Sequence, residues 1–192
     1  MRLGIIGLSQ SGKTTLFNAL TRGDRPVGPL RVTGGGRFEV QTAVVPVPDP
    51  RVDTLSAMFK PRKTIYAQVI YADIAGLDAE SSKSDKSGFS GPLLNQLAAM
   101  DGFLHVVRAF ENPTVPHPAG SVDPARDLAA LNGELLLNDL IAVERKLERL
   151  NEDDKKGIVK DRGQHTQEVA LFTKLHEALS ADRPLREVEL LP

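Results

Sequence analysis

The sequence predicts an α/β fold followed by a two-helix hairpin, and three observations predict it. An apolar strand at residues 2–6 leads through a glycine-containing turn into a helix. Runs rich in β-branched and aromatic residues then alternate with helical patterns, as in parallel-sheet proteins. After residue 123, leucines repeat at helical spacing in two separate stretches, which is typical of paired helices.

Composition excludes several classes of protein. The chain has 192 residues, 41% of them hydrophobic and 26% charged, which is ordinary for a globular protein. The absence of cysteine excludes disulfides, thiolate metal sites and cysteine nucleophiles. The net charge of -1 gives no overall attraction to nucleic acid or to anionic membranes. No apolar run approaches the ~20 residues of a membrane span. We therefore expect a cytoplasmic protein with no membrane part.

Each element follows from local pattern. Leu16, Phe17 and Leu20 place a helix at 14–22, and Pro46 and Pro48 end a strand that starts at Thr42. Pro92 and Pro124 each stand at the first position of a predicted helix. The remaining expected elements are a helix within 49–59, strands at 64–73 and 103–107, loops at 23–40, 77–90 and 109–122, and helices at 93–100, 124–150 and 164–180.

A phosphate-binding pattern joins the first strand to the first helix. Residues 7–14 match G-x-x-x-x-G-K-[ST], in which backbone N–H groups cradle phosphate oxygens. Lys13 would supply a positive charge at the β- and γ-phosphates, and Thr14 a hydroxyl for Mg²⁺. The alternative is a fortuitous glycine-rich strand–helix turn, but the strand–turn–helix context favours phosphate binding.

A second pattern, D-x-x-G, closes the long strand at Asp73 and Gly76. An aspartate at this strand end would support the Mg²⁺ shell, and the Gly76 N–H would reach a γ-phosphate. A turn-forming aspartate is the alternative. Together the two patterns predict a P-loop NTPase of the GTPase-like branch. A small-molecule kinase is the weaker interpretation, because Arg108 and Arg126 are the only arginines near that region.

The chain resembles the Obg-like ATPases, the YchF branch of the translation-factor P-loop GTPases. The likeness covers nearly the whole chain. It is carried by the two patterns above and by further stretches of sequence. These are V-P-D-P-R-V-D at 47–53, D-I-A-G-L at 73–77, H-V-V-R-A-F-E-N at 105–112, V-D-P-A-R-D at 122–127 and E-L-L-L-N-D-L at 134–140.

The resemblance implies a fold, a ligand and a set of site residues. The fold would be a partial G domain with strand order 2-3-1-4, in which only the second strand is antiparallel, plus the helical hairpin. The ligands would be Mg²⁺ and a purine nucleotide, ATP or GTP, with Thr14 and Asp73 at the metal. The implied nucleotide-binding residues are Ser9, Gln10, Ser11, Gly12, Lys13, Thr14, Thr15 and Gly76.

The resemblance also suggests how water is activated. Leu77 stands where Ras-like GTPases carry the glutamine that orients the attacking water, and leucine cannot do this. The family is thought to use a histidine after the fourth strand, and His117 occupies that place. Lys13 and His117 are therefore the candidate catalytic residues. An exposed loop histidine without a role is the alternative for His117. His105, inside an apolar strand, is expected to be a packed structural histidine.

Several family features are missing or altered. The chain stops at Pro192, before the base-recognition motif and the C-terminal domain of the family, so we expect a fragment or a reduced relative. Arg37 replaces the first-switch threonine, and the second switch, residues 86–92, has fewer glycines and one proline. Both changes put fast hydrolysis in doubt more than phosphate binding.

We expect three parts: a nucleotide-binding core at 1–122, a coiled-coil hairpin at 123–182 and a tail at 183–192. In the family the hairpin is thought to contact the ribosome or RNA, but mixed charge over 144–162 also fits a solvated face. The predicted function is slow, Mg²⁺-dependent NTP hydrolysis. The alternatives are a nucleotide-regulated interaction module with negligible turnover, and a scaffold that dimerises through its leucine seam. Base preference and oligomeric state stay open.

Overall fold

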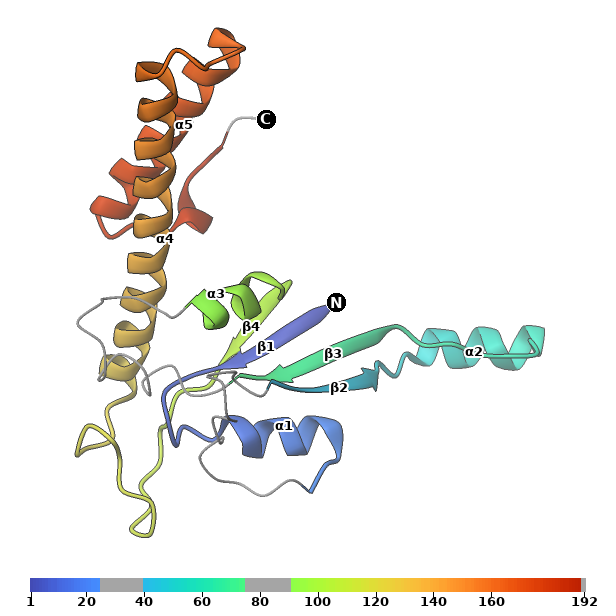
Figure 1. Ribbon diagram of the computed structural model, residues 1–192. Helices are drawn as coiled ribbons and strands as arrows, with labels where there is room; N and C mark the ends of the chain where they lie inside the picture. The colour runs from blue at the N-terminus through green and yellow to red at the C-terminus, as the bar shows by residue number, and fades with distance from the viewer. Residues whose placement is uncertain (25–39, 75–90, 191–192) are drawn as a thin grey trace. The chain divides into compact units, whose positions relative to one another are not determined.

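The computed structural model describes residues 1–24, 40–74 and 91–190. Within these residues the elements alternate as the sequence predicts (Figure 1). They are β1 (Arg2–Ile6), α1 (Lys13–Thr21), β2 (Gln41–Pro46), α2 (Pro50–Phe59), β3 (Gln68–Asp73), α3 (Gly91–Ala98), β4 (Gly102–His105), α4 (Pro124–Lys155), α5 (Arg162–Ser180) and the 3-10 turn η1 (Leu185–Glu187).

The four strands form one sheet in the order β2-β3-β1-β4, which confirms the predicted order. β1 pairs in parallel with β3 and with β4, whereas β2 pairs antiparallel with β3. The register sets Ile5 opposite Asp73, so the carboxyl ends of β1 and β3 lie side by side. Any residue that follows β1 is thereby brought next to Asp73.

Several element boundaries differ from the sequence prediction. The strand predicted over 64–73 begins only at Gln68, where its pairing with β2 starts opposite Pro46, although the Val47 N–H still donates to Ala67 O at 2.8 Å. The strand predicted over 103–107 ends at His105, although the Val106 N–H still donates to Ile6 O at 2.8 Å. The helix predicted to end near 150 continues to Lys155, where the ion pair between Glu152 and Lys156, four residues apart, supports the last turn.

The described contacts group the chain into two compact units, Met1–Leu128 and Ala129–Pro192. The core of the first is built from Ile5, Ile6 and Phe17, together with Ala72 and Ile74 at the end of β3. α1 packs on β1, β2 and β3, and Figure 1 shows α1 and α3 on opposite faces of the sheet. The sheet therefore carries a helix on each side close to the turn after β1.

In the second unit, α4 and α5 pack through an apolar cluster that also takes in η1. Its members are Leu136, Leu140, Val143, Leu147, Phe172, Leu175, Ala178, Leu179, Leu185 and Val188. The apolar positions of α4 that repeat at helical spacing, Leu136, Leu140, Val143 and Leu147, belong to it, and the next one, Leu150, is also buried. Among the described residues, no helix is both long enough and apolar enough to cross a bilayer.

Candidate nucleotide site

The turn between β1 and α1 has a backbone that only its glycines permit. Gly7 has φ 153°, and a Cβ there would lie 2.3 Å from the backbone oxygen of Val106. Gly12 has φ 103°, and Gln10, with φ 61°, is also left-handed. These three positions fold residues 7–12 back over the end of β1. The result is a short loop that leads directly into the first turn of α1.

The amino terminus of α1 fits an anion. Its N-cap is Gly12, which has no side chain to cap the first amides, and no acidic residue stands in the first turn. The amides of a helix start and the helix dipole both attract negative charge. The Ser11 hydroxyl nearby is buried and has no hydrogen-bond partner among the described residues. This combination suits a phosphate group.

Lys13 folds over its own loop. Its Nζ donates to Gly7 O at 3.0 Å and to Leu8 O at 2.7 Å, and the side chain is 7% exposed. The ammonium group is therefore held inside the loop, at the concave side that a phosphate would enter. A buried ammonium that already sits among carbonyl oxygens needs little movement to meet an anion there.

Thr14 and Asp73 form a pair at the mouth of this loop. Thr14 Oγ1 donates to Asp73 Oδ2 at 2.8 Å, and Asp73 is 1% exposed at the end of β3. A hydroxyl and a carboxylate next to a phosphate site are oxygen ligands of the kind Mg²⁺ takes, with phosphate and water completing its shell. Among the described residues, no group of three or more His, Asp or Glu side chains is placed to hold a metal ion by itself. The donor set fits Mg²⁺.

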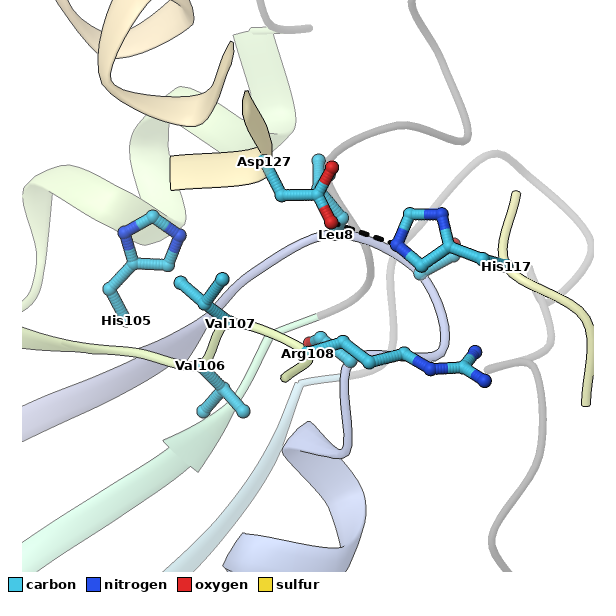
Figure 2. A pocket seen from close by; sticks show the side chains of 9 residues that line it. Leu8, His105, Val106, Val107, Arg108, His117 and Asp127 are labelled. Atoms are coloured by element: carbon cyan, nitrogen blue, oxygen red, sulfur yellow. Dashed lines mark hydrogen bonds and ion pairs between the residues drawn. The ribbon is translucent and has the colours of Figure 1, made fainter. Parts of the chain in front are cut away.

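His117 is buried beside the same loop. It lines a small pocket (Figure 2) whose other lining residues are Leu8, Ser9, Ser11, His105, Val106, Val107, Arg108 and Asp127. His117 Nε2 contacts Asp127 Oδ2 at 2.8 Å, and Nδ1 accepts from the Ala119 N–H at 3.1 Å. Since Nδ1 is an acceptor, Nε2 carries the proton and donates to Asp127. Both ring nitrogens are used in this conformation.

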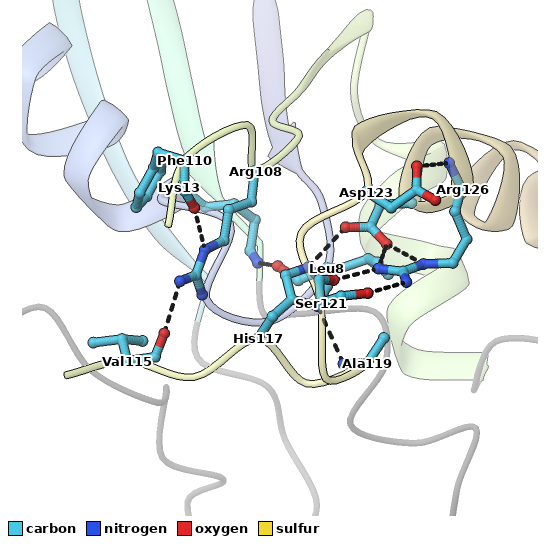
Figure 3. Close-up of polar contacts among 11 residues, drawn as sticks. Leu8, Lys13, Arg108, Phe110, Val115, His117, Ala119, Ser121, Asp123 and Arg126 are labelled. Carbon is cyan, nitrogen blue, oxygen red and sulfur yellow. Dashed lines mark hydrogen bonds and ion pairs between the residues drawn. The ribbon is translucent and has the colours of Figure 1, made fainter. Parts of the chain in front are cut away.

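Asp127 joins His117 to the first turn of α4, and the sequence analysis missed it. Its Oδ1 accepts from Arg126 Nε at 3.0 Å and from Arg126 Nη2 at 2.8 Å (Figure 3). Burial raises the pKa of Asp127, but hydrogen bonds from Arg126 and His117 outweigh it and leave the pKa below its usual value. The D-P pair that starts the helix places Asp127 one turn in, which was the signal available in the sequence.

Arg108 fixes the loop that carries His117. Its Nε donates to Phe110 O at 3.1 Å and its Nη2 to Val115 O at 2.7 Å (Figure 3). The guanidinium also lies 5.1 Å from the centre of the Phe110 ring, within cation–π range. Arg108 thus holds both ends of the segment from Phe110 to Val115, and the imidazole follows two residues later.

The remaining predicted site residues fall into three groups. Ser9 lines the pocket, while Gln10 and Thr15 are exposed at the turn and on α1. His105 is half-buried in β4; burial, and then the positive charge of Lys13, lower its pKa. Gly76, Leu77, Arg37 and most of the second switch lie outside the described residues.

Comparison with known proteins decides the family. A family model described as 50S ribosome-binding GTPase matches residues 2–159. The chain belongs to this family, in its Obg-like (YchF) branch. The ribosome-binding ATPase YchF of Haemophilus ducreyi is 40% identical over 156 residues, 81% of this chain and 42% of that protein. The Obg-like resemblance is therefore confirmed.

Two further Obg-like proteins cover the chain almost completely. The ribosome-binding ATPase YchF of Bacillus subtilis is 33% identical over 190 residues, 97% of this chain and 48% of that protein. The structure of the Schizosaccharomyces pombe YchF GTPase matches with a TM-score of 0.72 at 28% identity, over 100% of this chain and 50% of that chain. The P-loop GTPase fold is thereby confirmed. The chain spans about half the length of the relatives that it matches.

Proposed function

We propose that this chain binds a purine nucleoside triphosphate together with Mg²⁺ and hydrolyses it slowly, as part of a ribosome-linked Obg-like ATPase. The observation that carries the proposal is the Thr14–Asp73 pair, 2.8 Å apart at the mouth of a glycine-shaped loop that holds Lys13. The names of the relatives support both the hydrolysis and the ribosome link, since they are called ribosome-binding ATPases. A cytoplasmic location follows from the same link and stays a prediction.

The chain's own groups would act mainly by charge. Lys13 would exchange its bonds to Gly7 O and Leu8 O for phosphate oxygens, and the amides of residues 9–15 would surround the phosphates. Thr14 and Asp73 would hold the Mg²⁺, which neutralises charge on the transferred phosphoryl group when bound. Gly76 is the proposed further donor to the γ-phosphate. In phosphoryl transfer such electrostatic stabilisation supplies most of the catalysis.

His117 is the proposed group for orienting the attacking water, but its present hydrogen bonds would first have to break. Its Nε2–H is given to Asp127 and its Nδ1 accepts from Ala119, so neither nitrogen can hold a water in this conformation. A slow basal rate follows from this geometry. The same geometry favours the second candidate, a nucleotide-regulated interaction module in which turnover is negligible.

Calorimetric titration tests nucleotide binding directly. The purified chain is titrated, with Mg²⁺, against ATP, GTP and the two diphosphates. We expect binding of at least one triphosphate and its loss, by 100-fold or more, in Lys13→Ala. Lys155→Ala, at an exposed position of α4, serves as the matched control. Unchanged affinity in Lys13→Ala would contradict the phosphate site, and equal affinity for ATP and GTP would mean that only the phosphates are recognised.

Single-turnover hydrolysis separates the two candidate functions. With nucleotide at saturation, His117→Ala is expected to slow the chemical step by ~10²-fold, the lower range for a positioned proton-transfer group. If the wild-type chain binds nucleotide without measurable turnover, and His117→Ala changes nothing, the interaction module is the correct function.

A further inference from the structure

The segment between β2 and β3, residues 50–67, forms an arm that projects from the sheet. Figure 1 shows α2 extending beyond the paired ends of the two strands. All ten residues of α2 are exposed or half-buried. The arm leaves the sheet at Pro46 and returns at Gln68, whereas the phosphate loop meets β3 at Asp73. A six-residue strand of roughly 17–20 Å separates the two sites.

The arm is nevertheless held in one shape. Ser56 Oγ and Thr64 Oγ1 are 2.5 Å apart, and the Tyr66 hydroxyl donates to Asp53, so the returning chain is tied twice to α2. Asp49 caps the start of the helix, where it accepts from the Arg51 N–H at 2.9 Å. Lys60 ends it in a left-handed conformation. The tip of the arm, residues 58–65, is therefore presented on a defined support.

The tip combines unpaired cations with exposed apolar side chains. Lys60, Arg62 and Lys63 are all exposed, and in the part of the chain that the structure describes none of them makes an ion pair. Next to them Met58 is 68% exposed, Phe59 75% and Ile65 68%. Neither Asp49, which pairs with Arg51, nor Asp53, which accepts from the Tyr66 hydroxyl, forms an ion pair with these cations.

The hairpin, for which the family resemblance suggests a ribosome or RNA contact, has the opposite character. Its cations are largely balanced by carboxylates of the same unit: Lys146 pairs with Glu168 at 2.8 Å and Lys156 with Glu152 at 2.7 Å. Arg162 lies 3.7 Å from Asp154. Residues 144–162 carry seven Lys or Arg against six Asp or Glu, whereas the arm carries four against one. Attraction for a polyanion is concentrated in the arm.

We propose that the tip of the α2 arm is a docking surface for RNA. Lys60, Arg62 and Lys63 would contact phosphates, and Phe59 offers a face on which an unstacked base can stack. An anionic partner matches the charge, and a base matches an exposed ring beside cations better than an acidic peptide would. This inference rests on the ribosome link of the proposed function, but it does not depend on nucleotide hydrolysis.

Fluorescence anisotropy with a labelled 20-nucleotide single-stranded RNA tests the surface, at salt concentrations from 50 to 200 mM. The arm variant is Lys60→Gln, Arg62→Gln and Lys63→Gln together. Its matched control carries the same loss of charge on the hairpin: Arg145→Gln, Arg149→Gln and Lys160→Gln. We expect the arm variant to lower the slope of log K against log salt by about 2 and to weaken binding at 0.1 M salt by on the order of 100-fold. The hairpin variant should change affinity less than about twofold.

Phe59→Ala and a second probe separate RNA from any other polyanion. Phe59→Ala should weaken RNA binding about tenfold, since stacking on an aromatic ring is lost. A poly-glutamate peptide of equal charge should bind more weakly than RNA and should not respond to Phe59→Ala. Equal binding of poly-glutamate, a loss confined to the hairpin variant, or no RNA binding by the wild-type chain would each overturn the proposal.

Nucleotide titration of the same variants keeps the two proposals apart. The arm variant should bind ATP or GTP as the wild type does, because the arm and the phosphate loop lie at opposite ends of β3. RNA binding that depends on the arm, in a chain that binds no nucleotide, would contradict the proposed function alone. Nucleotide binding without arm-dependent RNA binding would contradict this inference alone.

Discussion

The two ends of β3 differ in how far their polar and aromatic side chains are exposed to solvent. At the carboxyl end, Asp73 is 1% exposed and Phe17, beneath the phosphate loop, also 1%. At the other end, Phe59 is 75% exposed and the tip cations Lys60, Arg62 and Lys63 have no carboxylate partner among the described residues. The side chains at the carboxyl end of β3 are already held in place in the free chain, as catalysis requires. At the amino end, the positive charge and apolar surface of the arm are available to a partner, as a docking surface requires.

The same substitution at both ends should give the sharpest contrast. Phe17→Ala removes a buried ring and is expected to cost ~3–5 kcal/mol in the free energy of unfolding. Phe59→Ala removes a ring that is mostly in water and should change it by less than about 0.5 kcal/mol. Urea unfolding of both variants measures the difference. A large loss in Phe59→Ala would show that α2 packs on something in the free chain, and the comparison would fail.

Gly7→Ala tests how rigid the ordered end is. The added Cβ would lie 2.3 Å from a backbone oxygen, Val106 O, in a conformation that L-residues rarely adopt. We expect a loss of ~2–4 kcal/mol in the free energy of unfolding together with loss of nucleotide binding. Gly133→Ala in α4, where nothing lies within 4 Å of the new Cβ, is the control. It should stabilise by up to ~1 kcal/mol, as Ala does in a helix. Equal effects of the two variants would mean that the loop relaxes freely.

The ordered end was largely predictable from the sequence, and the exposed end was not. The pattern at residues 7–14 fixes a loop, a helix start and a lysine together, so the shape of this loop followed from local chemistry, and phosphate binding stays a prediction. The position of Asp73 beside this loop was also predictable, because the carboxyl ends of neighbouring parallel strands lie at the same edge of a sheet. In contrast, Leu55, Met58 and Phe59 stand on one side of the helix expected within 49–59, yet all three are more than half exposed. Periodicity shows that a helix has an apolar face, but it does not show whether anything covers that face.

Contacts between distant segments explain the other misses. The Asp127 partner of His117 depends on where the loop over 109–122 returns to α4, and no local pattern encodes that path. The third strand was predicted four residues too long because Ile65 and Tyr66 favour strand, whereas in the structure both lie in the arm and the paired register starts at Gln68. Arg108 was noted only as one of two arginines in the region, and its two carbonyl partners were not predictable.

Asp73→Asn tests whether the carboxylate at the carboxyl end of β3 supports Mg²⁺. The amide keeps the shape and can still accept from Thr14, but the negative charge that would support Mg²⁺ is gone. We expect the Mg²⁺-dependent part of triphosphate affinity to fall ~10–100-fold, as for other groups that support a metal shell. Titration with and without Mg²⁺ measures it. Thr14→Ser, which keeps the hydroxyl, should stay close to wild type. If affinity without Mg²⁺ falls equally, Asp73 is only a structural acceptor.

A double-mutant cycle on His117 and Asp127 measures how firmly the imidazole is held. Each side chain is 5% exposed, and His117 donates a charge-assisted hydrogen bond to Asp127, so Asp127→Ala should cost ~1–3 kcal/mol in the free energy of unfolding. Most of that cost should be absent in a His117→Ala background, apart from the part due to Arg126. The coupling energy from urea unfolding is expected at ~1–2 kcal/mol. Simple additivity of the two changes would mean that the pair contributes nothing.

The smallest expected effect concerns pH and only the ordered end, since the arm contains no histidine. Burial, followed by the charge of Lys13, lowers the pKa of His105 below its usual value of 6.5. The unfolded chain then takes up a proton near pH 6.5, but the folded chain does so only at lower pH. Stability from the neutral imidazole is therefore complete above about pH 6.5 and is lost as the pH falls towards the folded-state pKa. His105→Gln should flatten the fall in melting temperature between pH 7 and pH 5 by a few degrees at most. The same substitution should leave the wild-type slope unchanged if His105 is protonated equally in both states. Triphosphate with Mg²⁺ should shrink the effect, because phosphate oxygens would offset the Lys13 charge that faces His105.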